Sequence, residues 1–351
     1  MKDFKKGSRF ADDMRLMVTA LVLASLLAGC SLPAPGPATT PSPTPSASPT
    51  VESPPITHAL RFDGASAFND TAAQVLAANG STRYRVPNST GNDEVARWAS
   101  SQFNASGWNV SWQGFTAQYG CVQMPMHNVV AERAGSSGRI VILGAHYDTR
   151  PIAESEKNES DRAKPIPGAN DGASGVGVLV ELARILPPLN DTVRLVLFDG
   201  EDGGEYLTSK CTDWLLGSTA YARSLNASDV KATSAMILVD MAGDPHLRLP
   251  REMSSTTSLA DRVYAIGGGL GYADVFVNDT KYGDTYQITD DHAPFLARGI
   301  PSLDLIHLER GIVFPEWHHT LHDDLSHVDQ ASLAKVGRTL ELWLLEESGP
   351  H

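Results

Sequence analysis

Histidine and acidic residues occur in three short segments that each follow an apolar run. These segments are His146-Tyr-Asp148, Asp199-Gly-Glu-Asp202 and Asp240. Catalytic zinc sites use about four ligands drawn from His, Asp, Glu and Cys, and they leave one position open for water or substrate. Cys121 and Cys211 lack the spacing of a ligand pair. A metal ion in this chain must therefore be held by histidines and carboxylates.

Seven residues are candidates for binding a metal or moving a proton: His146, Asp171, Glu201, Asp202, Asp240, Asp291 and His319. Each one alone has a simpler explanation, because an Asp after a strand is most often a helix cap or a turn residue. Asp171 lies among small residues that allow the backbone to pass close to an ion. Glu201 and Asp202 should point to opposite sides of an extended segment, so one can bind metal while the other acts as a base. Asp148 is placed to orient the imidazole of His146.

The elements that position these residues alternate between strands and helices. Apolar runs predict strands at 139–145, 193–198 and 235–239, a helix at 175–186 and an amphipathic helix at 329–345. This order predicts an α/β fold with a mixed, mostly parallel central sheet and helices on both faces. In such sheets, functional groups gather just past the carboxyl ends of the strands. No second linker or repeat follows residue 58, so we expect a single catalytic domain at 58–351.

The first thirty residues have the composition of an export signal. Five basic residues between Lys2 and Arg15 precede an apolar run, Leu16 to Ala28, that is too short to span a bilayer. The run leads to Leu27-Ala-Gly-Cys30, which resembles the cleavage box of prokaryotic lipoproteins, where Cys30 becomes the lipidated first residue. An uncleaved anchor helix is the alternative. Residues 31–57 are rich in Pro, Ser and Thr and are expected to form an extended tether.

These features predict an exported protein. It would be lipid-anchored to the outer face of the cytoplasmic membrane, or periplasmic or extracellular, and would touch the membrane only through Cys30. In that compartment Cys121 and Cys211 could form a disulfide, with two buried free thiols as the alternative. A formal net charge of −13 argues against a nucleic-acid partner. The oligomeric state is left open.

Eight short motifs together resemble the family that contains co-catalytic zinc aminopeptidases and glutaminyl cyclases. They are His146-Tyr-Asp148, Gly168–Gly175, Phe198-Asp-Gly-Glu-Asp202, Gly217-Ser218, Val239-Asp240, Asp290-Asp-His-Ala-Pro-Phe295, Gly299-Ile-Pro301 and His319-Thr320. They occur in the expected order from about Tyr84 to the final helix. The resemblance implies one or two zinc ions and a substrate that is the amino terminus of a peptide or protein.

The resemblance also assigns roles by position. Asp171, Asp202 and His319 match the ligands of the zinc found in both branches, and His319 is preferred to His318 because Thr320 preserves the His-Thr pair. His146 and Asp240 match the ligands of a second zinc in the aminopeptidase branch. Glu201 matches the general base, and in a cyclase Asp240 and Asp291 would hold the α-amine. Asp202 stands where Glu is common in the family, a shortening by one methylene that some bacterial-type cyclases are understood to share, so the pair Glu201-Asp202 resembles cyclases.

The sequence leans towards a cyclase, with a zinc aminopeptidase as the alternative. The long link from Gly203 to Leu216, including Trp214, and the string Asp290-Asp291-His292 are similar to cyclases. However, His318 replaces the Trp expected before the ligand His, and Leu207 replaces a second pocket Trp. We expected His318, His322 and His327 to be solvated. An inactive surface receptor would have a broken ligand set, and a serine hydrolase would need a Gly-x-Ser-x-Gly turn; neither is seen.

Overall fold

The computed structural model describes residues 59–349 except for 204–213, 278–286 and 312. All of them belong to one compact unit, Ser53–His351. The predicted export segment and tether, as well as Leu207 and Cys211, lie outside the described residues. Cys121 is disulfide-bonded. Within the described residues no helix is both long and apolar enough to cross a membrane.

Six strands form the central sheet, in the order β1-β2-β4-β3-β5-β8. The strands are β1 (Asn109–Tyr119), β2 (Val122–Arg133), β3 (Ile140–His146), β4 (Thr192–Phe198), β5 (Thr233–Asp240) and β8 (Ser302–Ile306). Strands β4, β3, β5 and β8 are parallel, while β1 and β2 form an antiparallel hairpin that joins β4 at the edge. Two short parallel strands, β6 (Leu249–Pro250) and β7 (Phe276–Val277), pair separately. The sheet is mixed and mostly parallel, as predicted.

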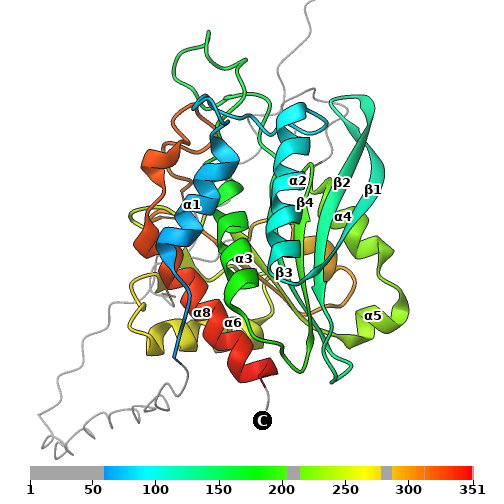
Figure 1. Ribbon diagram of the computed structural model, residues 1–351. Helices are drawn as coiled ribbons and strands as arrows, with labels where there is room; N and C mark the ends of the chain where they lie inside the picture. Colours follow the sequence, from blue (N-terminus) through cyan, green and yellow to red (C-terminus); the bar gives the residue numbers. More distant parts are fainter. Residues whose placement is uncertain (1–58, 204–213, 278–286, 312, 350–351) are drawn as a thin grey trace, which may run out of the picture. The chain divides into compact units, whose positions relative to one another are not determined.

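Helices cover both faces of this sheet (Figure 1). They are α1 (Gly64–Val75), α2 (Thr90–Ala105), α3 (Ala173–Ile185), α4 (Leu216–Ser224), α5 (Ala227–Ala232), α6 (Thr257–Gly269), α7 (Ala293–Leu296) and α8 (Gln330–Ser348). A short 3₁₀ helix lies at Leu325–His327. Helices α2, α3, α6 and α8 pack in the larger core on one face, and α1 lies over α3 and α8. Helices α4 and α7 pack in the smaller core on the other face.

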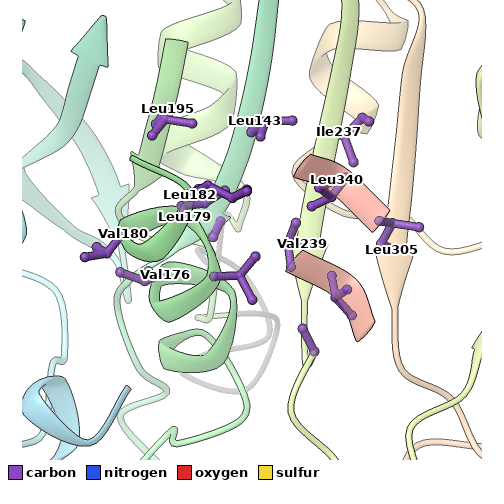
Figure 2. Packing of buried hydrophobic residues seen from close by; sticks show 14 of the residues in the cluster. Leu143, Val176, Leu179, Val180, Leu182, Leu195, Ile237, Val239, Leu305 and Leu340 are labelled. Atoms are coloured by element: carbon purple, nitrogen blue, oxygen red, sulfur yellow. The ribbon is translucent and has the colours of Figure 1, made fainter. Parts of the chain in front are cut away.

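Strand β3 separates the two cores by its alternating side chains. Val141 and Leu143 enter the larger core, whereas Ile140 and Ile142 enter the smaller one. Figure 2 shows α3 laid against the sheet, with Leu179 and Leu182 beside strand residues such as Leu143 and Leu195. Both faces of the parallel strands are buried, so a one-residue slip in register would move each side chain into the other core and disrupt the packing of both. The cores therefore fix where each strand ends, and with it the position of the residue that follows.

The predicted elements are confirmed, with ends that differ by at most three residues from those observed for β3, β4, β5, α3 and α8. The hairpin β1–β2 was not predicted. Its outer strand β1 is mostly half-buried or exposed, so it lacks the continuous apolar run that marks the inner strands.

Candidate metal and acid–base site

Three parallel strands end at one edge of the sheet and deliver candidate residues there. His146 is the last residue of β3, Asp240 is the last residue of β5, and Asp199–Asp202 follows β4. Because β4, β3 and β5 are neighbours in parallel, their carboxyl ends meet. The prediction that charged groups gather past these strand ends is confirmed.

Asp171 reaches the same place from the loop that leads into α3. The next residue, Gly172, has φ +92°, and a Cβ there would lie 2.7 Å from His146 Cε1. Only glycine allows both this backbone conformation and this close approach. The loop is fixed from behind by the buried Asp323, whose carboxylate accepts hydrogen bonds from the backbone N–H groups of Asn170 (2.8 Å) and Asp171 (3.2 Å).

The five predicted ligands form two adjacent sets that share Asp171. In one set, His319 Nε2 lies 3.7 Å from Asp171 Oδ2 and 3.5 Å from Asp202 Oδ1. In the other, His146 Nε2 lies 3.0 Å from Asp171 Oδ1 and 3.4 Å from Asp240 Oδ1. Ligands around a tetrahedral zinc lie about 3.3 Å apart, given bonds of about 2.0–2.1 Å. The buried Asp202 Oδ2 also accepts no hydrogen bond from the described residues. This donor set fits a divalent metal ion.

His318 also lies close to Asp171, at 3.8 Å from Nε2 to Oδ2. The rings of His318 and His319 stack with centroids 3.6 Å apart and an interplanar angle of 25°. The ligand atoms of Asp171, His318 and His319 all lie within 4.8 Å of one another, but of the two histidines His319 also lies 3.5 Å from Asp202. Glu154 Oε1 contacts His319 Nδ1 at 2.7 Å, which leaves Nε2 of His319 for a metal. The geometry thus favours His319 as the ligand.

The expectation that His318 is solvated differs from what is observed. His318 is sandwiched between His319 and Phe314, whose ring stacks on it with centroids 4.2 Å apart. Burial lowers the pKa of His318 to about 3, so its imidazole is neutral at physiological pH. His322 is exposed, as expected, and His327 is partly buried against the ring of Trp317.

Arg150 and Glu154 were not identified from the sequence, although both touch predicted ligands. Arg150 Nη1 lies 2.5 Å from Asp202 Oδ1, and Arg150 Nε lies 2.8 Å from Glu154 Oε1. Glu154 in turn contacts His319, as described above. The two residues are four positions apart in a loop without periodicity. Their charge is the only feature of the sequence that could have pointed to them.

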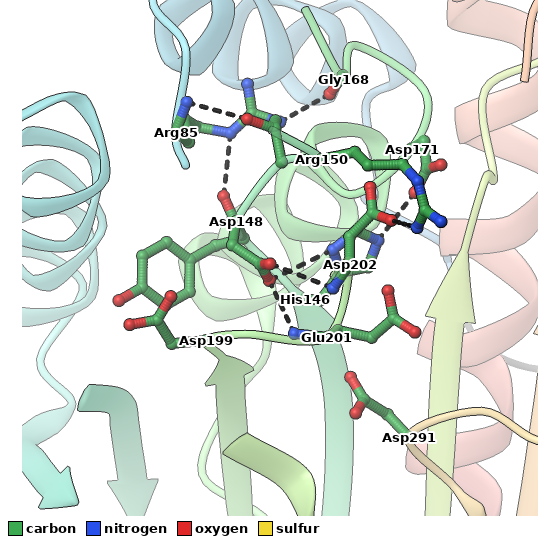
Figure 3. Close-up of polar contacts among 12 residues, drawn as sticks. Arg85, His146, Asp148, Arg150, Gly168, Asp171, Asp199, Glu201, Asp202 and Asp291 are labelled. Atoms are coloured by element: carbon green, nitrogen blue, oxygen red, sulfur yellow. Dashed lines mark hydrogen bonds and ion pairs between the residues drawn. The ribbon is translucent and has the colours of Figure 1, made fainter. Parts of the chain in front are cut away.

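Asp148 connects the two halves of the site. Its carboxylate accepts hydrogen bonds from the backbone N–H groups of Glu201 and Asp202, both at 3.1 Å, and lies 3.5 Å from His146 Nδ1 (Figure 3). The expected contact between Asp148 and His146 is present. In addition, Asp148 fixes the backbone of the acid pair, which had not been foreseen.

Glu201 and Asp202 face different partners, as predicted. The side chain of Asp202 extends towards Arg150, whereas that of Glu201 extends towards Asp291 (Figure 3). Burial raises the pKa values of Glu201 and Asp291 well above the usual range. Burial, together with the charge of Asp240, also raises the pKa of Asp290 to about 7. Carboxyl groups of this kind hold protons more readily than exposed acids, as proton-transfer groups must.

A cavity of about 890 Å³ opens over the site. Asp171, Glu201, Asp202, Asp240 and His319 line it, together with Asp290, whereas His146 and Asp291 lie behind the lining. Its lining also contains the apolar or aromatic residues Trp214, Ile288, Ile306 and Phe314. Trp317 does not line this cavity; its indole is buried and donates a hydrogen bond to Asp244 (2.8 Å). The cavity lining therefore combines acids and predicted ligands with apolar and aromatic side chains.

Both the sequence and the fold of this chain are similar to those of known proteins. The sequence profile of peptidase family M28 matches residues 128–344. A glutaminyl-peptide cyclotransferase-like protein of Bos taurus is 27% identical over 292 residues, which are 76% of this chain and 72% of the relative. The glutaminyl cyclase structure from Porphyromonas gingivalis superposes with a TM-score of 0.74 at 29% identity and covers 82% of this chain and 99% of its own. A Zn-dependent exopeptidase from Parabacteroides distasonis gives a TM-score of 0.72 at 28% identity, with 80% and 97% covered.

Proposed function

Because the chain belongs to peptidase family M28, we propose that it is a zinc-dependent glutaminyl-peptide cyclotransferase that converts an amino-terminal Gln to pyroglutamate and releases ammonia. Two kinds of relatives support an enzyme acting on peptide amino termini: the glutaminyl cyclases and the zinc exopeptidases. The donor set of the site suits zinc, since it combines His nitrogen with carboxylate oxygen in tetrahedral spacing.

The observation that carries the choice of a cyclase is the group of aromatic side chains in the cavity lining. The sequence lacks a tryptophan at position 318, which left the pocket for the Gln side chain in doubt. In the structure, the rings of Phe314 and His318 stack on each other, and both line the cavity together with Trp214. A side chain that must fold back onto its own amine needs such a confining surface.

In this proposal the acids carry the protons. Asp171, Asp202 and His319 would hold a zinc ion, which would polarise the side-chain carbonyl of the substrate Gln. Asp240 lines the cavity and holds the α-amine. Glu201 accepts a proton from the amine as its nitrogen forms the new bond to the side-chain carbonyl carbon. It then donates this proton to the side-chain nitrogen, which leaves as ammonia. Asp291 was expected to hold the amine as well, but it is fully buried and does not line the cavity. Burial is the main cause that raises the pKa of Glu201.

An aminopeptidase remains the second candidate because the second ligand set is complete. His146 and Asp240 lie within ligand spacing of Asp171, and two ions there would suit hydrolysis of the first peptide bond with Glu201 as the base. The two functions differ in product. A Gln peptide loses ammonia in a cyclase, whereas a Leu peptide releases free leucine in an aminopeptidase.

The test uses the full chain loaded with zinc and both peptides, followed by mass spectrometry. Ammonia loss from the Gln peptide with the Leu peptide intact supports the cyclase. The Glu201→Gln variant controls for spontaneous cyclisation. Release of leucine assigns the aminopeptidase, and no reaction of either peptide overturns both.

We further propose that the protein is displayed outside the cytoplasm on a lipid anchor at Cys30. The motif Leu27-Ala-Gly-Cys30 and the Pro-rich tether at 31–57 support this. In a bacterial host, Cys30→Ser should abolish labelling with radioactive palmitate. Equal labelling of that variant would contradict the anchor.

A further inference from the structure

We propose that Arg150 is a positioning residue that holds two of the predicted zinc ligands in place, Asp202 directly and His319 through Glu154. This inference rests on the zinc site of the proposed function. It concerns residues that no motif singled out.

The contacts form one continuous chain through the cavity wall. Arg150 Nη1 lies 2.5 Å from Asp202 Oδ1, and Arg150 Nε lies 2.8 Å from Glu154 Oε1 and 2.9 Å from Glu154 Oε2. Glu154 Oε1 then lies 2.7 Å from His319 Nδ1. The side chains of Arg150 and Asp202 are only 5% and 2% exposed, so water screens their interaction weakly.

Each predicted ligand keeps acceptor capacity for the metal beside its protein partner. Arg150 occupies Asp202 Oδ1, while Asp202 Oδ2 accepts no hydrogen bond within the described part of the chain. Glu154 occupies His319 Nδ1, which leaves Nε2 directed towards Asp171 and Asp202. Partners of this kind fix the tautomer and orientation of a ligand, and their loss typically weakens metal binding.

Arg150 also supplies charge that the site otherwise lacks. It is the only Arg or Lys among the described residues that line the cavity, beside Asp171, Asp202 and Glu154. The contact of Arg150 with Glu154 does not depend on Asp202, because different guanidinium nitrogens make the two contacts. The guanidinium fork can thus hold both carboxylates at fixed angles, which the ammonium of lysine cannot reproduce.

The experiment measures zinc affinity of the full chain without substrate, by competition with a chromophoric chelator. Arg150→Gln and Glu154→Gln should each bind zinc about 10- to 100-fold more weakly than the wild type. Arg150→Lys should recover part of the loss. Arg162→Gln is the matched control, because Arg162 lies exposed in the same loop and donates to the Glu156 carbonyl away from the ligands. It should bind zinc normally.

A second readout separates positioning from a general loss of structure. The visible absorption of the Co²⁺-loaded protein should change in Arg150→Ala, and added guanidinium should restore both this spectrum and the zinc affinity. Wild-type zinc affinity and spectrum in Arg150→Gln would overturn the positioning role alone. If Asp202→Asn also keeps wild-type zinc affinity, the zinc site of the proposed function fails with it. A variant that unfolds and is not rescued by guanidinium would count against positioning.

Discussion

Glu201 and Asp202 are neighbours in the chain, yet their carboxylates serve opposite sides of the site. Asp202 contacts Arg150 and lies 3.5 Å from His319, whereas Glu201 extends towards the buried Asp291. Asp148 holds the backbone N–H of both residues and so fixes this divergence. This arrangement supports the proposal that Asp202 binds the metal while Glu201 transfers protons.

Replacing Glu201 by Gln should abolish turnover without loss of zinc. The amide has nearly the same size but cannot carry the proton, and such transfer contributes about 10²–10⁴-fold to a rate. Steady-state kinetics and metal analysis by mass spectrometry on the same sample provide the check. If zinc is lost in equal measure, the roles of the acid pair have been assigned in reverse.

The metal content should distinguish the two ligand sets. Under the cyclase proposal, one zinc binds at Asp171, Asp202 and His319. Asp202→Asn and His319→Gln should then lose zinc, while Asp240→Asn should retain one ion per chain. Elemental analysis after dialysis measures this. A wild-type content of two ions that falls to one in Asp240→Asn would favour the aminopeptidase.

Removal of Arg85 should destabilise the loops that carry His146 and Asp171. Its buried guanidinium donates to the carbonyl oxygens of Tyr147 (2.8 Å), Pro167 (2.9 Å) and Gly168 (2.6 Å). Burial lowers the pKa of Arg85 only to about 10, so it stays charged at neutral pH. Arg85→Met should reduce the free energy of unfolding by about 3 kcal/mol, because it leaves buried carbonyls without donors.

The control for Arg85 is Arg97→Met, which removes an exposed ion pair with Asp93 and should cost at most about 0.5 kcal/mol. Urea denaturation of both variants gives the comparison. Equal stability of the two would show that Arg85 does not organise the loops.

Stability should decline as the pH rises through the titration of Asp70. Burial raises the pKa of this carboxyl group from 3.8 to about 6, although the Arg184 guanidinium opposes the shift. The folded state therefore binds a proton that the unfolded state releases between about pH 4 and 6. The stabilisation is complete below pH 4 and is lost above pH 6, on the order of 1–3 kcal/mol.

Asp70→Asn removes this titration, so the difference in unfolding free energy between wild type and variant should change across pH 4–7. Urea denaturation at several pH values measures it. Parallel pH curves for the two proteins would contradict the assignment.

The sequence was sufficient for the parts of the site that depend on strand ends. The apolar runs before His146, Asp199 and Asp240 predict buried parallel strands, and such strands place their carboxyl ends together. The small residues around Asp171 similarly indicated a close approach, which Gly172 makes against His146. These features follow from local composition and from the topology that it implies.

The sequence was not sufficient for contacts that only the folded chain brings about. Glu154 lies in a loop without periodicity, and its partner His319 is far away in the sequence. The burial of His318 likewise depends on the Phe314 ring stacked against it. The edge hairpin β1–β2 was missed because its outer strand is largely exposed or half-buried and has a weak apolar pattern.

The central claim is that this site cyclises amino-terminal glutamine. The most direct measurement incubates the zinc-loaded chain with a Gln peptide and a Leu peptide of otherwise identical sequence and follows both masses over time. The account predicts that the Gln peptide loses ammonia at a rate that depends on Glu201, while the Leu peptide stays intact. Release of free leucine, with the Gln peptide losing ammonia no faster than in the Glu201→Gln control, would contradict it.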